Sequence, residues 1–169
     1  MNTLITNPAD EVSTTTEEII IPANETTQAL TDNTIKEPVA AVLPNGYLCG
    51  GYYATTDKGA IYLRAEYVGK YAEELACQFS CGMKTSDFTA LFRELKRSKK
   101  KTLPYEARQT AIFEMLPKAL VLVNRKKAPM LLVDFIRANS AAVCCDDDAM
   151  AFLRHTEAIA AYMSVSAAV

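Results

Sequence analysis

Hydrophobic residues recur three or four positions apart from Ile61 to Met163, which is the spacing of amphipathic helices. Glycine, proline and clusters of charged residues interrupt this pattern, as they do at the ends of short helices. The helices that we expect cover residues 61–82, 85–97, 104–115, 129–140 and 146–163. The pattern therefore predicts an all-α fold, a compact bundle of about five helices within residues 61–169.

Local signals indicate where these helices begin and end. Thr85 or Ser86 can cap the second helix, and Pro117 should break or kink the third. The acidic run Asp146–Asp148 offers a cap and a favourable charge for the last helix. The three carboxylates could also hold a divalent cation, but consecutive residues at a helix start point in different directions, so we favour capping.

The first 60 residues differ in composition from the rest. Residues 1–45 are rich in Thr, Asn, Glu and Pro, and their one apolar run is the short segment 19–21. The free energy gained by burying so little apolar surface cannot offset the entropy lost when the segment orders. We therefore predict an acidic disordered arm. Residues 46–60 contain glycine and tyrosine pairs and the turn-like segment 56–59, which together suggest a tight turn or a small hairpin.

Charge is distributed unevenly along the chain. The formal net charge is -2, yet residues 1–60 carry eight acidic and two basic side chains, whereas residues 84–137 carry thirteen basic and five acidic ones. Positive charge concentrated in an otherwise acidic chain favours a polyanionic partner over a merely solvated face. Few aromatic residues lie among these charges, so phosphate contacts that are independent of base sequence are the expected mode of binding.

Catalytic chemistry has little to rest on in this sequence. His155 is the single histidine, and the five cysteines lack the usual spacings of structural zinc sites, so we expect reduced thiols and no metal or cofactor. A glycine-rich phosphate loop and a nucleophile elbow are also absent. With no signal-peptide pattern and no long apolar stretch, the sequence predicts a cytoplasmic, non-enzymatic protein that does not enter a membrane.

Four short segments give the chain a resemblance to a known family. The segment Phe152–Tyr162 is similar to the closing helix of the small helical subunit of type III-A CRISPR effector complexes, with an aromatic residue followed by Glu-Ala-Ile-x-Ala-Tyr. Pro117-Lys118, with Arg125 seven residues beyond the lysine, resembles that family's central motif. The segments Tyr71–Ala76 and Met83–Phe88 are similar to its earlier helix and to the turn that follows.

The resemblance implies a five-helix subunit of a ribonucleoprotein that serves antiviral defence. Several copies would stack along the inner side of a filament, beside the backbone and large subunits and the CRISPR RNA, and would hold target RNA or the guide–target duplex without cleaving it. Lys118 and Arg125 are the candidate contacts that combine family position with charge. Five more candidates rest mainly on charge: Arg93, Lys96, Arg97, Lys126 and Lys127. Lys99, Lys100 and Lys101 have charge alone, and their contact with RNA stays open.

A second hypothesis is compatible with the same charges. The chain could be a helical protein-interaction module whose basic face docks an acidic partner, or its own residues 1–45. The two hypotheses differ in whether the basic residues contact phosphates or carboxylates.

Overall fold

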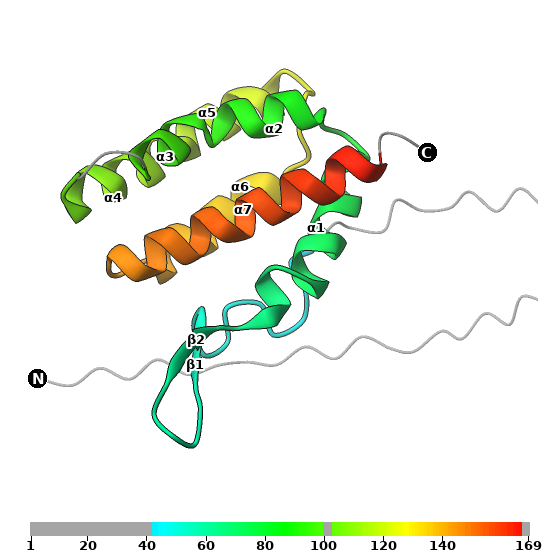
Figure 1. Cartoon of the computed structure of the whole chain (residues 1–169). Helices are drawn as coiled ribbons and strands as arrows, with labels where there is room; N and C mark the ends of the chain where they lie inside the picture. Colours follow the sequence, from blue (N-terminus) through cyan, green and yellow to red (C-terminus); the bar gives the residue numbers. More distant parts are fainter. Residues whose placement is uncertain (1–41, 100–102, 167–169) are drawn as a thin grey trace, which may run out of the picture. The chain divides into compact units, whose positions relative to one another are not determined.

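The computed structural model describes residues 42–99 and 103–166, all of which belong to one compact unit (Figure 1). These residues are mainly helical, with one short hairpin at the start, so the predicted all-α fold class is confirmed. The elements are β1 (Tyr53–Thr55), β2 (Ile61–Leu63), a 3-10 turn (Ala65–Tyr67), α1 (Lys70–Ser80), α2 (Thr85–Leu91), α3 (Arg93–Ser98), α4 (Tyr105–Phe113), α5 (Met115–Asn124), α6 (Leu131–Ala142) and α7 (Asp146–Ser166).

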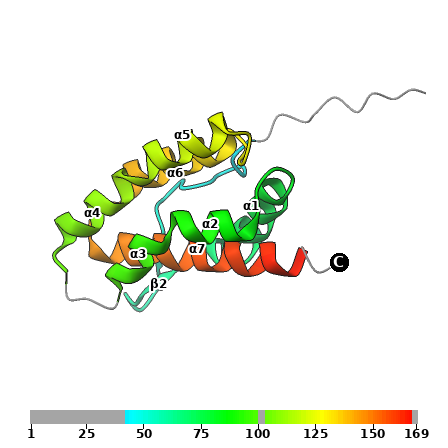
Figure 2. The same cartoon turned by 90° about the horizontal axis from the view of Figure 1, so that it is seen from above.

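The helices from α2 to α7 pack in two layers. Helix α2 lies on α7, and α4 and α5 lie on α6, while α2 also touches α5 within its own layer (Figure 2). Helix α1 packs against α7. This arrangement brings the α1–α2 connection and the α5–α6 turn to the same region of the unit, and that region carries most of the candidate site described below.

Helix α6 supplies the centre of the core. Six of its residues are buried, because its sequence is apolar around much of its circumference: Leu131, Leu132, Val133, Phe135, Ile136 and Asn139. The ring centroid of Phe135 lies 5.6 Å from that of Phe79 in α1 and 5.7 Å from that of Phe152 in α7. Aromatic contacts at these distances join three helices, and truncation of such a side chain costs about 3–5 kcal/mol.

Asn139 is the one buried amide in this apolar helix. Its Oδ1 atom accepts hydrogen bonds from the hydroxyls of Tyr52, at 2.6 Å, and Tyr47, at 3.2 Å, and its Nδ2 atom donates to the carbonyl of Phe135, at 2.6 Å. Burial raises the pKa of both tyrosines, so their hydroxyls stay protonated donors. The amide therefore fastens the segment before β1 to α6.

His155 in α7 is buried among aromatic rings. Its Nδ1 atom contacts the carbonyl of Tyr67, and its Nε2 atom has no hydrogen-bond partner among the described residues. The rings of Tyr47, Tyr67 and Phe135 lie 5.3 to 5.7 Å from the imidazole, centroid to centroid. Burial lowers the pKa of His155 from 6.5 to about 4, because the charged imidazolium would lose its hydration.

The prediction of one helix over residues 61–82 is wrong for residues 61–69. Ile61–Leu63 forms strand β2, which pairs antiparallel with β1, and α1 begins only at Lys70. The predicted turn explains this, because Thr56 and Gly59 form a hydrogen-bonded loop in which Gly59 has a φ of +81°. The expected hairpin therefore exists, but its second strand lies beyond residue 60, in a stretch whose apolar spacing only resembled a helix.

The arm predicted for residues 1–45 is too long at its inner end. Pro44 is buried and Leu43 packs partly against the core, so the last residues assigned to the arm belong to the folded unit. Residues 1–41 lie outside the described part of the chain.

The second predicted helix differs from the structure, whereas the predicted break at Pro117 agrees with it. The second helix divides at Phe92 into α2 and α3, and neither Thr85 nor Ser86 caps it, because Lys84 occupies the cap position. Pro117 breaks the third helix as predicted: α4 ends at Phe113 and the proline falls in the first turn of α5, where its missing N–H has no cost. Segment 118–124, which had no assigned structure, is helical.

The acidic run lies in the first turn of α7, where its charge suits the helix dipole as predicted, but Cys145 and not an aspartate occupies the cap position. The Oδ2 atom of Asp148 accepts a hydrogen bond from the backbone N–H of Cys144, at 3.0 Å, and all three aspartates lie in the first turn.

We predict that the free energy of unfolding falls as the pH decreases from about 6.5 toward 4. In this window the unfolded chain binds a proton at His155 and the folded chain does not, so protons favour unfolding. The full effect is on the order of 3 kcal/mol, since each pKa unit corresponds to about 1.4 kcal/mol. Urea titrations at pH 7.0 and 5.5 measure the upper part of this window, in which about 1 kcal/mol should be lost. His155→Leu should show a much smaller difference between the two values, and an equal difference would contradict the assignment.

Candidate nucleic-acid interface

The seven predicted contact residues are all exposed, and they lie in two places. One group is on α3, and the other extends from α5 into the turn before α6. The α3 group is Arg93, Lys96 and Arg97, and the second group is Lys118, Arg125, Lys126 and Lys127.

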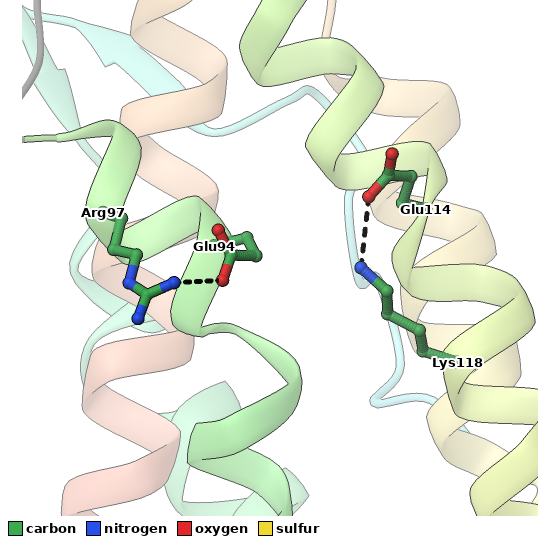
Figure 3. Close-up of polar contacts among 4 residues, drawn as sticks. All are labelled: Glu94, Arg97, Glu114 and Lys118. Atoms are coloured by element: carbon green, nitrogen blue, oxygen red, sulfur yellow. Dashed lines mark hydrogen bonds and ion pairs between the residues drawn. The ribbon is translucent and has the colours of Figure 1, made fainter.

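Carboxylates neutralise three of the seven side chains. Arg97 bonds Glu94 at 2.6 Å and Lys118 bonds Glu114 at 3.1 Å, each within its own helical region (Figure 3). Lys96 lies 3.7 Å from Glu157 in α7, a carboxylate that it shares with Lys99. Exposed pairs of this kind contribute about 0–1 kcal/mol, so a phosphate can displace the carboxylate, but the local charge is balanced until it does.

The remaining basic side chains form no ion pair with any carboxylate among residues 42–99 and 103–166. They are Arg93 on α3 and the consecutive residues Arg125, Lys126 and Lys127, which we call the 125–127 turn. Lysines 100 and 101 lie outside the described residues. The net positive charge that the sequence spreads over residues 84–137 is thus concentrated, in the described structure, at the end of α5.

The 125–127 turn has the geometry of a Schellman motif. The N–H of Lys127 donates to the carbonyl of Leu122, at 2.9 Å, and that of Lys126 donates to the carbonyl of Val123, at 2.8 Å. Lys126 has a φ of 56°, in the left-handed region. Glycine normally occupies this position, because a side chain there costs about 1–2 kcal/mol. Positive charge at the end of α5 also suits the helix dipole.

A polar groove separates the 125–127 turn from the connection between α1 and α2. Its volume is about 560 Å³, and its walls include Lys84 together with Lys126 and Lys127. Gly82 also lines the groove, and a Cβ atom at this position would lie at an ordinary contact distance, 3.6 Å, from the Cδ atom of Pro129. Lys84 lies inside the segment Met83–Phe88 but was not among the predicted contacts. It is a single lysine with no basic residue next to it in the sequence, so charge clustering did not indicate it.

A second, mostly apolar groove of about 320 Å³ runs between α2 and α5. Its lining residues are Asp87, Ala90, Leu91, Lys118, Val121 and Leu122. Leu120 and Val121 are exposed on the same helix. An unusually apolar α5 thus carries Lys118 at the edge of a surface suited to protein contacts.

The residues considered for catalysis or metal binding are not brought together. The five cysteines are free and exposed. His155 is enclosed in the core, and the described residues contain no cluster of three side chains that could hold a metal ion.

Comparisons with known proteins do not assign the chain to a family. No family model matches it, and neither a curated protein nor a solved structure gives a significant match. Within the described part of the chain, no helix has the length and apolar character needed to cross a bilayer.

We predict that Lys126→Gly raises the free energy of unfolding by up to about 1 kcal/mol, because glycine adopts the left-handed conformation without a Cβ penalty. Lys126→Ala removes the same charge but keeps the Cβ, so it should leave stability nearly unchanged. Urea denaturation of the two variants and the parent chain provides the measurement. A lower stability for the glycine variant than for the alanine variant would show that the turn is not strained.

Proposed function

We propose that the chain is a non-catalytic, RNA-binding small subunit of a type III-A CRISPR effector complex. The observation that carries the RNA-binding part is the 125–127 turn, whose three exposed basic side chains, at the end of one helix, form no ion pair within the described part of the chain. The resemblance of segments around Lys118 and Arg125 to the family supports the choice of complex. Target RNA or a guide–target duplex would be held through its phosphates.

Phosphate contacts would differ in character between the two groups of residues. At the 125–127 turn an RNA phosphate meets side chains that form no ion pair with a carboxylate among the described residues, although Asp87 lines the adjoining groove. At Lys118, Arg97 and Lys96 it must first displace one. We therefore assign the dominant contacts to Arg125, Lys126 and Lys127, and a weaker, exchangeable set to the paired residues.

The apolar groove between α2 and α5 supports assembly with other proteins. A subunit that works in several copies beside backbone and large subunits needs contact surface besides its RNA-binding face. Val121, Leu122 and Leu91 offer apolar area of that kind next to Lys118.

The second candidate function is a protein-interaction module, and the same groove favours it. Here the 125–127 turn would pair with carboxylates of an acidic partner whose apolar side chains fill the groove. This reading requires binding to a protein and no measurable affinity for RNA.

We predict that Lys118→Ala combined with Arg125→Ala weakens binding of single-stranded RNA by the full chain, or by the complex that contains it. Each lost phosphate contact should reduce the slope of log K against log salt by about 0.7. Fluorescence anisotropy across a salt titration measures affinity and slope together. Lys58→Ala combined with Lys70→Ala is the matched control, since it removes equal charge from the hairpin loop and α1. Equal affinities for the two double variants would show that these positions are wrong.

We also predict that Glu114→Gln strengthens RNA binding at low salt. The substitution removes the carboxylate 3.1 Å from the Lys118 ammonium and leaves that cation available. Glu73→Gln is the control, because Glu73 is also an exposed acid in a terminal turn, but it pairs with no cation in the described structure. If both variants bind RNA equally well, the gain reflects net charge alone and Lys118 is not a contact.

A further inference from the structure

We propose that the polar groove between the α1–α2 connection and the 125–127 turn is a phosphate-binding site, in which Lys84 and Lys126 hold the RNA strand from opposite walls. The inference rests on the proposed RNA binding and specifies where the strand lies. It adds Lys84, which neither the charge pattern nor the family resemblance had singled out, and it gives Lys126 a particular role.

The composition of the groove suits a phosphodiester. Three lysines and one aspartate line it, and the hydroxyls of two serines add neutral hydrogen-bonding groups. The residues that line it are Ser80, Cys81, Gly82, Met83, Lys84, Ser86, Asp87, Lys126 and Lys127. Neither Lys84 nor Asp87 takes part in an ion pair with another described residue, so the three lysines of the groove outnumber its one carboxylate and none of them is paired with it. Ammonium groups on flexible stems are suited to a phosphate whose orientation varies along a strand.

The two walls are held by the fold rather than by their own contacts. Met83 is buried and anchors the α1–α2 connection, and the Schellman hydrogen bonds of Lys126 and Lys127 fix the opposite wall. A site whose backbone is fixed before binding has less ordering entropy to lose when a strand enters it.

The left-handed Lys126 is the observation that points to a ligand. Glycine would satisfy the same turn without strain, and Arg125 and Lys127 already provide positive charge for the helix dipole. Neither backbone geometry nor helix stability therefore explains a lysine here. Side chains retained in strained conformations concentrate at functional sites, and this one lines the groove.

The first test measures RNA affinity and thermal stability on the same variants of the full chain. Lys126→Gly should lower affinity for a single-stranded RNA and flatten the salt slope by about 0.7, while its melting temperature is unchanged or higher. Lys84→Ala should lower affinity in the same way. Lys70→Ala, on α1 and outside the groove, is the control for lost charge. Because the stability of Lys126→Gly does not fall, a loss of binding cannot result from unfolding.

The second test uses Cys81, whose thiol is exposed and whose residue lines the groove. Alkylation by N-ethylmaleimide, followed by mass spectrometry, gives a rate for each cysteine. Bound RNA should slow the reaction of Cys81 severalfold and leave that of Cys144, which is exposed before α7, unchanged. Inorganic phosphate and a mononucleotide, tested at equal phosphate concentration, should protect Cys81 far less than the strand does.

The outcomes separate this inference from the proposed function. If RNA binding depends on Lys118 and Arg125 but not on Lys84 or Lys126, and Cys81 stays reactive, the groove is wrong and the function stands. If the parent chain and its complex bind no RNA, the proposed function fails. Protection of Cys81 by a mononucleotide or phosphate as strong as that by RNA would replace the strand with a small phosphorylated ligand. Protection by an acidic peptide instead would overturn the phosphate assignment.

Discussion

The hydrogen bonds of Asn139 hold together two parts of the chain that local sequence does not join. An amide in the middle of an apolar helix would cost about 1–3 kcal/mol if it were left unpaired. Here it is saturated by Tyr47, Tyr52 and a backbone carbonyl, so its burial is tolerated only when the segment before β1 lies on α6. The aromatic rings that surround this node extend to Phe135 and His155 and complete the core. The hairpin and the helices thereby become one unit, with α1 fixed in place.

Fixing α1 has a consequence for the surface. Its C-terminal end leads into residues 80–84, which form one wall of the polar groove, and α6 begins directly after the other wall. Both walls therefore depend on helices whose buried sides meet in the same core, through Phe79 and Phe135. The distance between the two walls is therefore set by the core and not by the lysines. Substitution of a lysine should change the charge of the groove without changing the fold.

The sequence was informative where periodicity and charge coincide with helices, and less so where tertiary contacts decide. The helical fold, the break at Pro117 and the acidic first turn of α7 follow from local chemistry. Strand β2 could not be recognised from the sequence, because Ile61, Ala65 and Val68 have the spacing of a helix. Ile61 is extended only because it pairs with β1. Helix α5 was not predicted, because Pro117 indicated the end of one helix and gave no sign that another helix begins around it. Charge counting identified the basic middle but not its pairing, since Glu157 reaches Lys96 and Lys99 from a distant part of the sequence.

Charge pairing also decides which basic residues are suited to bind a polyanion. A lysine on a helix surface acquires a carboxylate neighbour easily, since residues three or four apart are adjacent, and Lys118 and Arg97 both do so. A turn that leaves the helix axis removes its side chains from that neighbourhood. In the 125–127 turn the left-handed step at Lys126 redirects the chain immediately after α5, and the three cations have no carboxylate one turn away. The left-handed conformation of Lys126 is thus linked to the exposure of its charge, because the same change of direction separates the three cations from carboxylates on the helix.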